Sequence, residues 1–337
     1  MQAPWKTALA AVLLIALTAA PAQKAFGQQT ILIGNATAND TQAAANDKFA
    51  ELITKYSNGK LKASARHGSS LGSIAQMVAA LQAGSVHGMI FPAGFLSATV
   101  PQISTFDMPF LLPGEPAKIT AFAAQSKGAA KMTELAEQKG IHILGFHGIG
   151  PQSLLTKFPV DSVDDLKGKK FRVIPSPPRV GAYQDWGAVA RPMEFSEVYT
   201  ALQQGTIDGM DNPPDVIFKM KHHEVAKYFT ITHHNAFVSN VIVSKVWFDR
   251  LPKDLQAAIE RAGKEAIAFA DEDYTKTQKT SLEAMAKLIT VKEMPKAELA
   301  KMKELNMKGV WERMRKDPVR GPMLKLLEED VIRFTKS

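Results

Sequence analysis

The sequence predicts an α/β protein built from two domains, and three observations lead to this conclusion. Stretches typical of strands and of helices alternate along the chain with short loops, which is the pattern of a largely parallel sheet. Beyond a short leader, about 310 residues remain, enough for two domains of ordinary size. One helical stretch, at about 251–288, is nearly free of glycine and proline; at 1.5 Å per residue it would extend roughly 55 Å, longer than one small domain.

The N-terminus has the pattern of a secretory signal peptide. A short segment carrying Lys6 precedes an uncharged apolar run at 7–20, and small residues follow up to Gly27. The run is shorter than the ~20 apolar residues that a membrane span needs. We therefore expect residues 1–27 to be removed on export to the periplasm, with the cleavage site between Ala22 and Gly27 left open. An uncleaved anchor is the alternative.

The composition excludes several classes of protein. The chain has no cysteine, which rules out thiol catalysis, zinc–thiolate sites and disulfides. Its formal net charge is +8, but acids lie among most of the basic residues, and the densest basic cluster, 167–170, follows two aspartates. A nucleic-acid surface requires a basic stripe with stacking aromatics, so we expect no nucleic-acid partner. A mildly basic chain instead favours small anionic ligands.

The first half of the chain contains four predicted strands and three predicted helices. Asp40 or Thr41 can cap the first helix, which Asn58-Gly59 ends, and Gly84 closes the second at its C′ position. The stretch at 147–156 reads as a crossing segment rather than a compact turn. The strands are predicted at 31–33, 61–65, 89–91 and 141–146, and the helices at about 41–56, 74–82 and 116–139.

The second half continues the alternation before the long helix. A helical turn at 164–168 precedes a strand at 170–174. Ser196 is positioned to cap a helix that Gly205 ends, and a strand at 207–210 follows. After the long helix, a last helical region at 296–334 is broken at Asp317-Pro318.

Arg172 is the most informative single residue. It alternates with Phe171 and Val173 on an apolar strand, so one face of the sheet must accommodate a guanidinium. The planar fork of arginine matches a carboxylate through two parallel hydrogen bonds, which suggests an anion-binding role. A structural role, paired with Asp208 or Glu194, is equally compatible with these residues.

The motifs of common enzymes are missing. The chain has no G-x-S-x-G elbow, no G-x-G-x-x-G fingerprint and no phosphate loop. A hydrolase or lyase using Asp208 or Asp211 as a base is the only enzymatic alternative. The adjacent histidines at 222–223 and 233–234 do not place two metal ligands on one face, so we expect surface or hinge positions for them. We expect no catalytic residues, no metal and no cofactor.

Two stretches resemble the solute-receptor subunits of the tripartite ATP-independent periplasmic (TRAP) transporters. They are DDLKGKKFRV at 164–173 and MEFSEVYTALQQGTIDGMDNP at 193–213. The part at 194–213 is highly specific. Supporting stretches at 49–61, 71–72, 106–111 and 224–228 extend the resemblance, in order, over most of the mature chain.

The resemblance implies a fold and a function. The fold is a two-lobed periplasmic-binding-protein (flytrap) fold, with hinge strands and a long helix spanning both lobes. It places residues 28–149 plus about 238–277 in the N-terminal lobe, and 150–237 plus about 278–337 in the C-terminal lobe. The function is capture of a small organic acid and its delivery to the small and large integral membrane subunits, with the receptor as a monomer. A ligand-sensing receptor for a signalling partner is the alternative.

Four residues match the ligand-binding positions of the family. Arg172 stands where the family has its carboxylate-binding arginine. Phe195 corresponds to a pocket aromatic and Asn212 to the pocket amide of the motif D-G-Q-E-N-P. Asn35, just after the first strand, corresponds to a polar contact from the N-terminal lobe.

Departures from the family pattern narrow the class of ligand that we expect. Gln152 stands where many members have a second arginine, which suggests one strong anion rather than a compact dicarboxylate. Gly94 and Phe95 lie in the stretch where sialic-acid receptors have an acid and an arginine, so sialic acid is not expected. Phe95, Trp186 and Phe195 favour an apolar or aromatic ligand body. Which acid is bound, and whether a cation accompanies it, stays open at this level.

Overall fold

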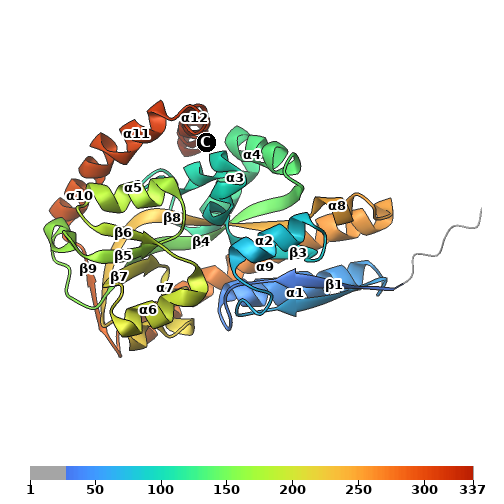
Figure 1. The fold of residues 1–337 in the computed structure, drawn as a ribbon, viewed down its shortest axis with the longest axis horizontal. Helices are drawn as coiled ribbons and strands as arrows, with labels where there is room; N and C mark the ends of the chain where they lie inside the picture. The colour runs from blue at the N-terminus through green and yellow to red at the C-terminus, as the bar shows by residue number, and fades with distance from the viewer. Residues whose placement is uncertain (1–27, 337) are drawn as a thin grey trace, which may run out of the picture.

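The computed structural model describes residues 28–336, so the signal peptide predicted at 1–27 lies outside the described residues. A single mixed sheet of nine strands runs through the molecule in the order β2-β1-β3-β8-β4-β7-β5-β6, with β9 beside β8. Helices lie around this sheet in two halves (Figure 1). The predicted α/β class is confirmed. No helix within residues 28–336 is long and apolar enough to cross a membrane.

Two long antiparallel strands join the halves. They are β4 (Ile141–Thr156) and β8 (Tyr228–Ser244), and their register shifts at three places of β4, between residues 143 and 145, between 148 and 150, and between 152 and 154. Strand β3 contacts β8 only along its C-terminal part, at 239–243, and β7 contacts β4 only along its C-terminal part, at 153–156. Each half therefore has its own strands, and the irregular region between them falls within the crossing predicted at 147–156.

The N-terminal half is built from parallel strands and capped helices. The Asp40 side chain accepts from Ala43 N at the start of α1, and Ser73 forms a reciprocal capping box with Gln76 at the start of α2. The elements are β1 (Gln29–Gly34), α1 (Thr41–Tyr56), β2 (Leu61–Arg66), α2 (Ile74–Gln82), β3 (Gly88–Pro92), η1 (Ala93–Ala98), η2 (Pro101–Asp107), α3 (Pro116–Gln125) and α4 (Lys127–Glu137).

The single helix predicted at 116–139 is wrong, because the chain divides at Ser126. This residue has an extended backbone and its side chain accepts from Ala129 N, so it ends α3 and caps α4. Asp330 of the last helix reinforces the break by accepting hydrogen bonds from Ser126 Oγ (2.7 Å) and Gly128 N (2.8 Å). Gly128, two residues further on, lies within the first turn of α4 and did not by itself signal the break.

The C-terminal half repeats the α/β alternation around shorter strands. The helix predicted to begin at Ser196 instead starts as a 3₁₀ turn, and its α-helical part has Glu197 at the N-cap position without a capping side-chain hydrogen bond. The elements are η3 (Val163–Leu166), β5 (Lys170–Val173), α5 (Pro177–Asp185), β6 (Val189–Pro192), η4 (Phe195–Glu197), α6 (Val198–Gln204), β7 (Gly209–Asn212), α7 (Pro214–Lys219) and η5 (His222–Glu224).

The predicted long helix is confirmed as α9 (Lys253–Met285), whose 33 residues extend about 50 Å at 1.5 Å per residue. It packs against α1 and α3 of one half and α7 of the other. It follows the short α8 (Lys245–Phe248) and precedes β9 (Thr290–Glu293), α10 (Lys296–Lys308), α11 (Val310–Lys316) and α12 (Gly321–Lys336). Because α12 packs on α3 and α4 (Figure 1), the C-terminal segment reaches back to the N-terminal half.

Candidate ligand-binding site

A small, mostly apolar cavity lies where the two halves meet. It is narrow: the centre of a water molecule has about 20 Å³ in which to move. Its walls carry eight apolar and four polar side chains drawn from both halves and from β8. The lining residues are Ala36, Thr37, Gln42, Ile74, Pro92, Phe95, Arg172, Ile174, Phe195, Asn212, Val216 and Phe237.

Arg172 provides the charge of this cavity. It is 1% exposed, on β5, and its Nε and Nη2 both donate to Met193 O, at 3.1 and 3.0 Å. Its guanidinium lies 5.9 Å from the ring centre of Phe95 and 5.8 Å from that of Phe195. Burial lowers the pKa of Arg172 to about 10, so the side chain stays charged at neutral pH.

The structural pairing considered for Arg172 is not present. Asp208 accepts from Lys170 N at 2.8 Å, and Glu194 accepts from Ile74 N at 3.3 Å. Throughout residues 28–336, no carboxylate oxygen lies within 4.0 Å of the Arg172 nitrogens. A buried cation without an acid of its own is costly unless an anion arrives from outside.

Asn212 supplies an unpaired donor beside this charge. It ends β7, is 2% exposed and lines the cavity, and its Nδ2 has no hydrogen-bond partner. Buried donors are normally paired, so this group points to a missing acceptor. Thr37 and Gln42 also line the cavity, and sequence reasoning missed both because neither belongs to a recognisable motif.

Four of the predicted site residues do not line the cavity. Asn35 bonds to Thr37, from Nδ2 to Oγ1 at 3.1 Å, and Gln152 accepts from Asn235 at 3.4 Å. Gly94 lies behind the wall, where an added Cβ would stand 2.1 Å from Asp107 Oδ2. Trp186 is buried in the C-terminal half, with Nε1 donating to Met302 O at 3.0 Å. The structure thus brings together Arg172, Phe95, Phe195 and Asn212 of the predicted set.

A second buried arginine, which the sequence did not single out, lies next to the cavity. Arg179 on α5 donates from Nη1 to Asp211 Oδ2 at 2.8 Å and lies 3.6 Å from Asp107. His234 Nε2 contacts the same Asp211 oxygen at 3.0 Å. Burial alone would raise the pKa of Asp211, but the charge of Arg179 and the bond from His234 lower it to about 2. Asp211 is therefore unsuited to act as the base considered above.

The histidine pairs form no metal site. His222 and His223 are buried, contrary to the surface position expected for them, because they pack against rings of the C-terminal half. Burial lowers the pKa of His222 to about 3, which keeps it neutral. His233 and His234 lie on the crossing strand β8, where His234 is buried. Within residues 28–336, no group of three or more His, Cys, Asp or Glu is arranged to hold a metal.

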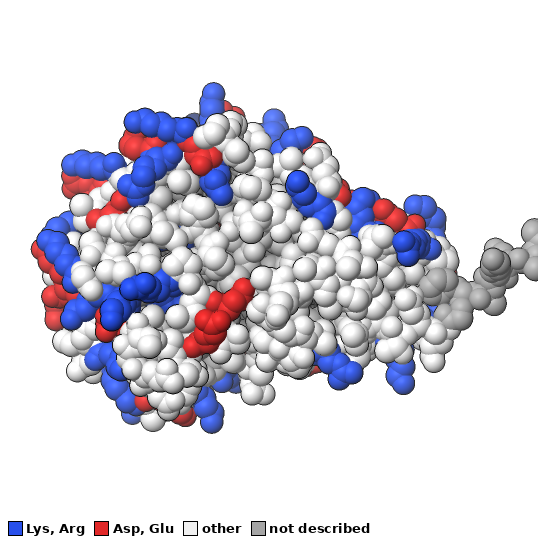
Figure 2. All heavy atoms as spheres, in the orientation of Figure 1, with Lys and Arg blue, Asp and Glu red and all other residues white. Residues whose placement is uncertain are grey.

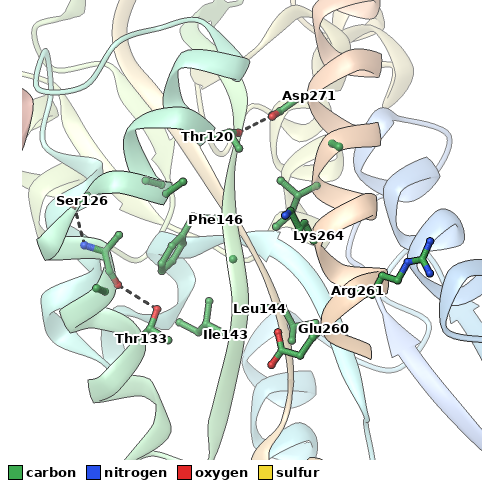
Figure 3. Close-up of a pocket in the computed structure, with 17 residues that line it drawn as sticks. Thr120, Ser126, Thr133, Ile143, Leu144, Phe146, Glu260, Arg261, Lys264 and Asp271 are labelled. Carbon is green, nitrogen blue, oxygen red and sulfur yellow. Dashed lines mark hydrogen bonds between the residues drawn. The ribbon is translucent and has the colours of Figure 1, made fainter. Parts of the chain in front are cut away.

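A larger cavity, about 770 Å³, lies elsewhere, between α3, α4, β4 and α9 (Figure 3). It shares no lining residue with the interlobe cavity. Its lining is rich in alanine, and polar groups at its edge are bonded to one another, as Thr120 Oγ1 is to Asp271 at 2.6 Å. The face shown in Figure 2 has basic and acidic side chains interspersed along most of its rim, and an acidic group near its middle.

Comparison with known proteins decides the family. Residues 33–317 match the sequence profile of DctP, described as bacterial extracellular solute-binding protein, family 7. The chain belongs to this family. A solute-binding protein of Verminephrobacter eiseniae is 35% identical over 75% of this chain and 76% of its own length. The C4-dicarboxylate-binding periplasmic protein DctP of Rhodobacter capsulatus is 34% identical over 71% of each chain.

Solved structures agree with the family and with the two-lobed fold. A TRAP periplasmic solute-binding protein from Desulfovibrio salexigens, with bound orotic acid, superposes with a TM-score of 0.85 at 28% identity. The superposition covers 90% of this chain and 99% of that one. These findings confirm the resemblance to TRAP receptors and the two-lobed α/β fold. The chain is therefore a solute-binding protein, and members of its family are periplasmic binding proteins.

Proposed function

We propose that this receptor captures a monocarboxylate with an apolar or flat body, using Arg172 as the carboxylate anchor, and delivers it to the membrane subunits of a TRAP transporter. The observation that carries the proposal is the buried, charged guanidinium of Arg172 at a cavity wall, with no carboxylate oxygen of residues 28–336 within 4.0 Å of its nitrogens. The Nδ2 of Asn212 is a donor for a second ligand oxygen. In this proposal the protein acts as an exported monomer and performs no chemistry.

The lining supports an apolar ligand body. Eight of the twelve lining side chains are apolar, and Phe95, Phe195 and Phe237 are among them. Aromatic faces pack well against flat or branched ligands. The bound orotic acid of the Desulfovibrio receptor, one carboxyl group on a flat ring, has this character. A C4-dicarboxylate, the ligand named for the Rhodobacter relative, is the second candidate, but Arg172 is the only charged side chain in the lining.

Native mass spectrometry of freshly purified protein, followed by calorimetry, tests this function. We expect one ligand per chain, with a mass and fragmentation pattern of a monocarboxylic acid. Titration with orotate, succinate and galactonate should rank orotate first if a flat body matters. Succinate binding most tightly would replace the monocarboxylate with the dicarboxylate class. Conversion of any of these acids at a catalytic rate would contradict the absence of chemistry.

A further inference from the structure

Two carboxylates of the C-terminal half lie against helix N-termini of the N-terminal half. Glu194 Oε2 accepts from Ile74 N, the first residue of α2, at 3.3 Å. Asp215 Oδ2 accepts from Thr41 N, the first residue of α1, at 3.1 Å. Both bonds cross the boundary between the halves, so they exist only when the halves are together.

The contact of Glu194 completes the cap of α2. Ser73 and Gln76 already satisfy each other's backbone amides through the capping box, and Ile74 N belongs to the same first turn. First-turn amides have no partner within their helix, and the partial positive charge there favours a carboxylate. The described structure therefore meets this requirement of the N-terminal half with a group from the C-terminal half.

Glu194 is also tied to the ligand site through its chain neighbours. The carbonyl of Met193 accepts both hydrogen bonds from Arg172, and Phe195 lines the cavity. On the other side of the boundary, Ile74 lines the same cavity. A ligand that fixes Arg172 and Phe195 thereby fixes the backbone on both sides of Glu194, and a ligand against Ile74 positions its partner.

We propose that Glu194 is a closure latch: a positioning residue that stabilises the closed form by capping α2 of the opposite half, without touching the ligand. The role of the latch rests on the proposed function, because a ligand is what the closed form would hold. The contact between Glu194 and Ile74 does not depend on which acid is bound. Ligand binding and the latch would then reinforce each other, since both act only on the closed form. Removing the latch should raise the open population and shorten ligand residence.

The distance between two spin labels, one in each half and measured by electron paramagnetic resonance, tests the latch directly. The chain has no cysteine, so labels can be placed at Ala79→Cys on α2 and Gln203→Cys on α6, both exposed positions in opposite halves. The distance distribution is recorded for the protein as purified and with orotate, succinate or galactonate at saturation. We compare the doubly labelled protein, called the parent, with the same protein carrying Glu194→Ala or Glu194→Gln. The control is Glu197→Gln, since Glu197 is an exposed glutamate three residues from Glu194.

We expect Glu194→Ala to lower the ratio of closed to open protein by about three- to tenfold, with Glu194→Gln intermediate because it keeps an acceptor but loses the charge. The control should match the parent. An unchanged ratio in Glu194→Ala, or a parent that shows no closed population in any condition, overturns the latch. If none of the acids binds, and Arg172→Ala has the closed population of the parent, the proposed function fails, while a loss of closure in Glu194→Ala still supports the latch.

Discussion

Arg172 and Arg179 are two buried arginines of the same half with opposite surroundings. Arg179 is 2% exposed and has carboxylates from η2 and β7 beside it, with His234 completing the cluster. Arg172 is 1% exposed; among the described residues it donates hydrogen bonds only to a backbone carbonyl, it lies beside two aromatic rings, and Asp211 and Glu194 act on it without forming an ion pair. The ion pairs of Arg179 are those of a structural cluster, whereas the charge of Arg172 has no ion pair, and under the proposed function the ligand anion supplies it.

The largest effect should come from Arg172→Ala. Loss of one side of a buried ion pair costs ~3–5 kcal/mol, so ligand affinity should fall by about 10²- to 10⁴-fold in calorimetry. Arg172→Lys should restore only part of it, because a point charge cannot supply the fork. Arg191 is the register partner of Arg172 on β6 and is exposed, which makes Arg191→Ala the matched control. A destabilised Arg172→Ala with near-normal affinity would remove Arg172 from the site.

Arg179→Ala should show the reverse pattern. It leaves Asp211 and Asp107 buried without their cation, which should cost ~3–5 kcal/mol of unfolding free energy. Denaturant unfolding checks this, and ligand affinity of the folded variant should stay within a few-fold of the parent. Equal losses of affinity in Arg172→Ala and Arg179→Ala would show that the two arginines are not distinct in role.

Asn212→Ala should have an intermediate effect on binding. Its Nδ2 is a buried donor without a partner, and a hydrogen bond to a charged ligand contributes ~1.5 kcal/mol or more, which is roughly tenfold in affinity. Asn212→Asp should bind more weakly still, because it places a second negative charge beside the ligand carboxylate. Affinity unchanged in both variants, measured by calorimetry, would place the ligand away from β7.

Trp186→Phe should have the smallest effect on affinity, within twofold. The indole donates to Met302 O and packs against Tyr183 and His234, away from the cavity lining. Its loss should instead lower the free energy of unfolding by about 1–2 kcal/mol, because a buried carbonyl loses its donor. A tenfold fall in affinity would restore the sequence-based prediction that Trp186 contacts the ligand.

The sequence by itself determined the α/β class and the long helix α9, and it singled out Arg172 as a candidate site residue. Periodicity, caps and helix length are local properties, and Arg172 lies within a long stretch that resembles the family. The sequence did not predict the break between α3 and α4 at Ser126. The side chain of Ser126 is hydrogen-bonded there to Asp330 of α12, which lies 204 residues further along the chain.

The tertiary structure alone decided which residues meet at the site. Phe95, Phe195 and Asn212 join Arg172 at the cavity, whereas Trp186 and Gln152 are drawn into other contacts. The surroundings of Arg172 and Arg179 also differ only in three dimensions, because the acids beside Arg179 are 32 or more residues away along the chain. A residue type and its strand can be predicted from local pattern, but whether a buried charge has a partner depends on elements that only folding brings together.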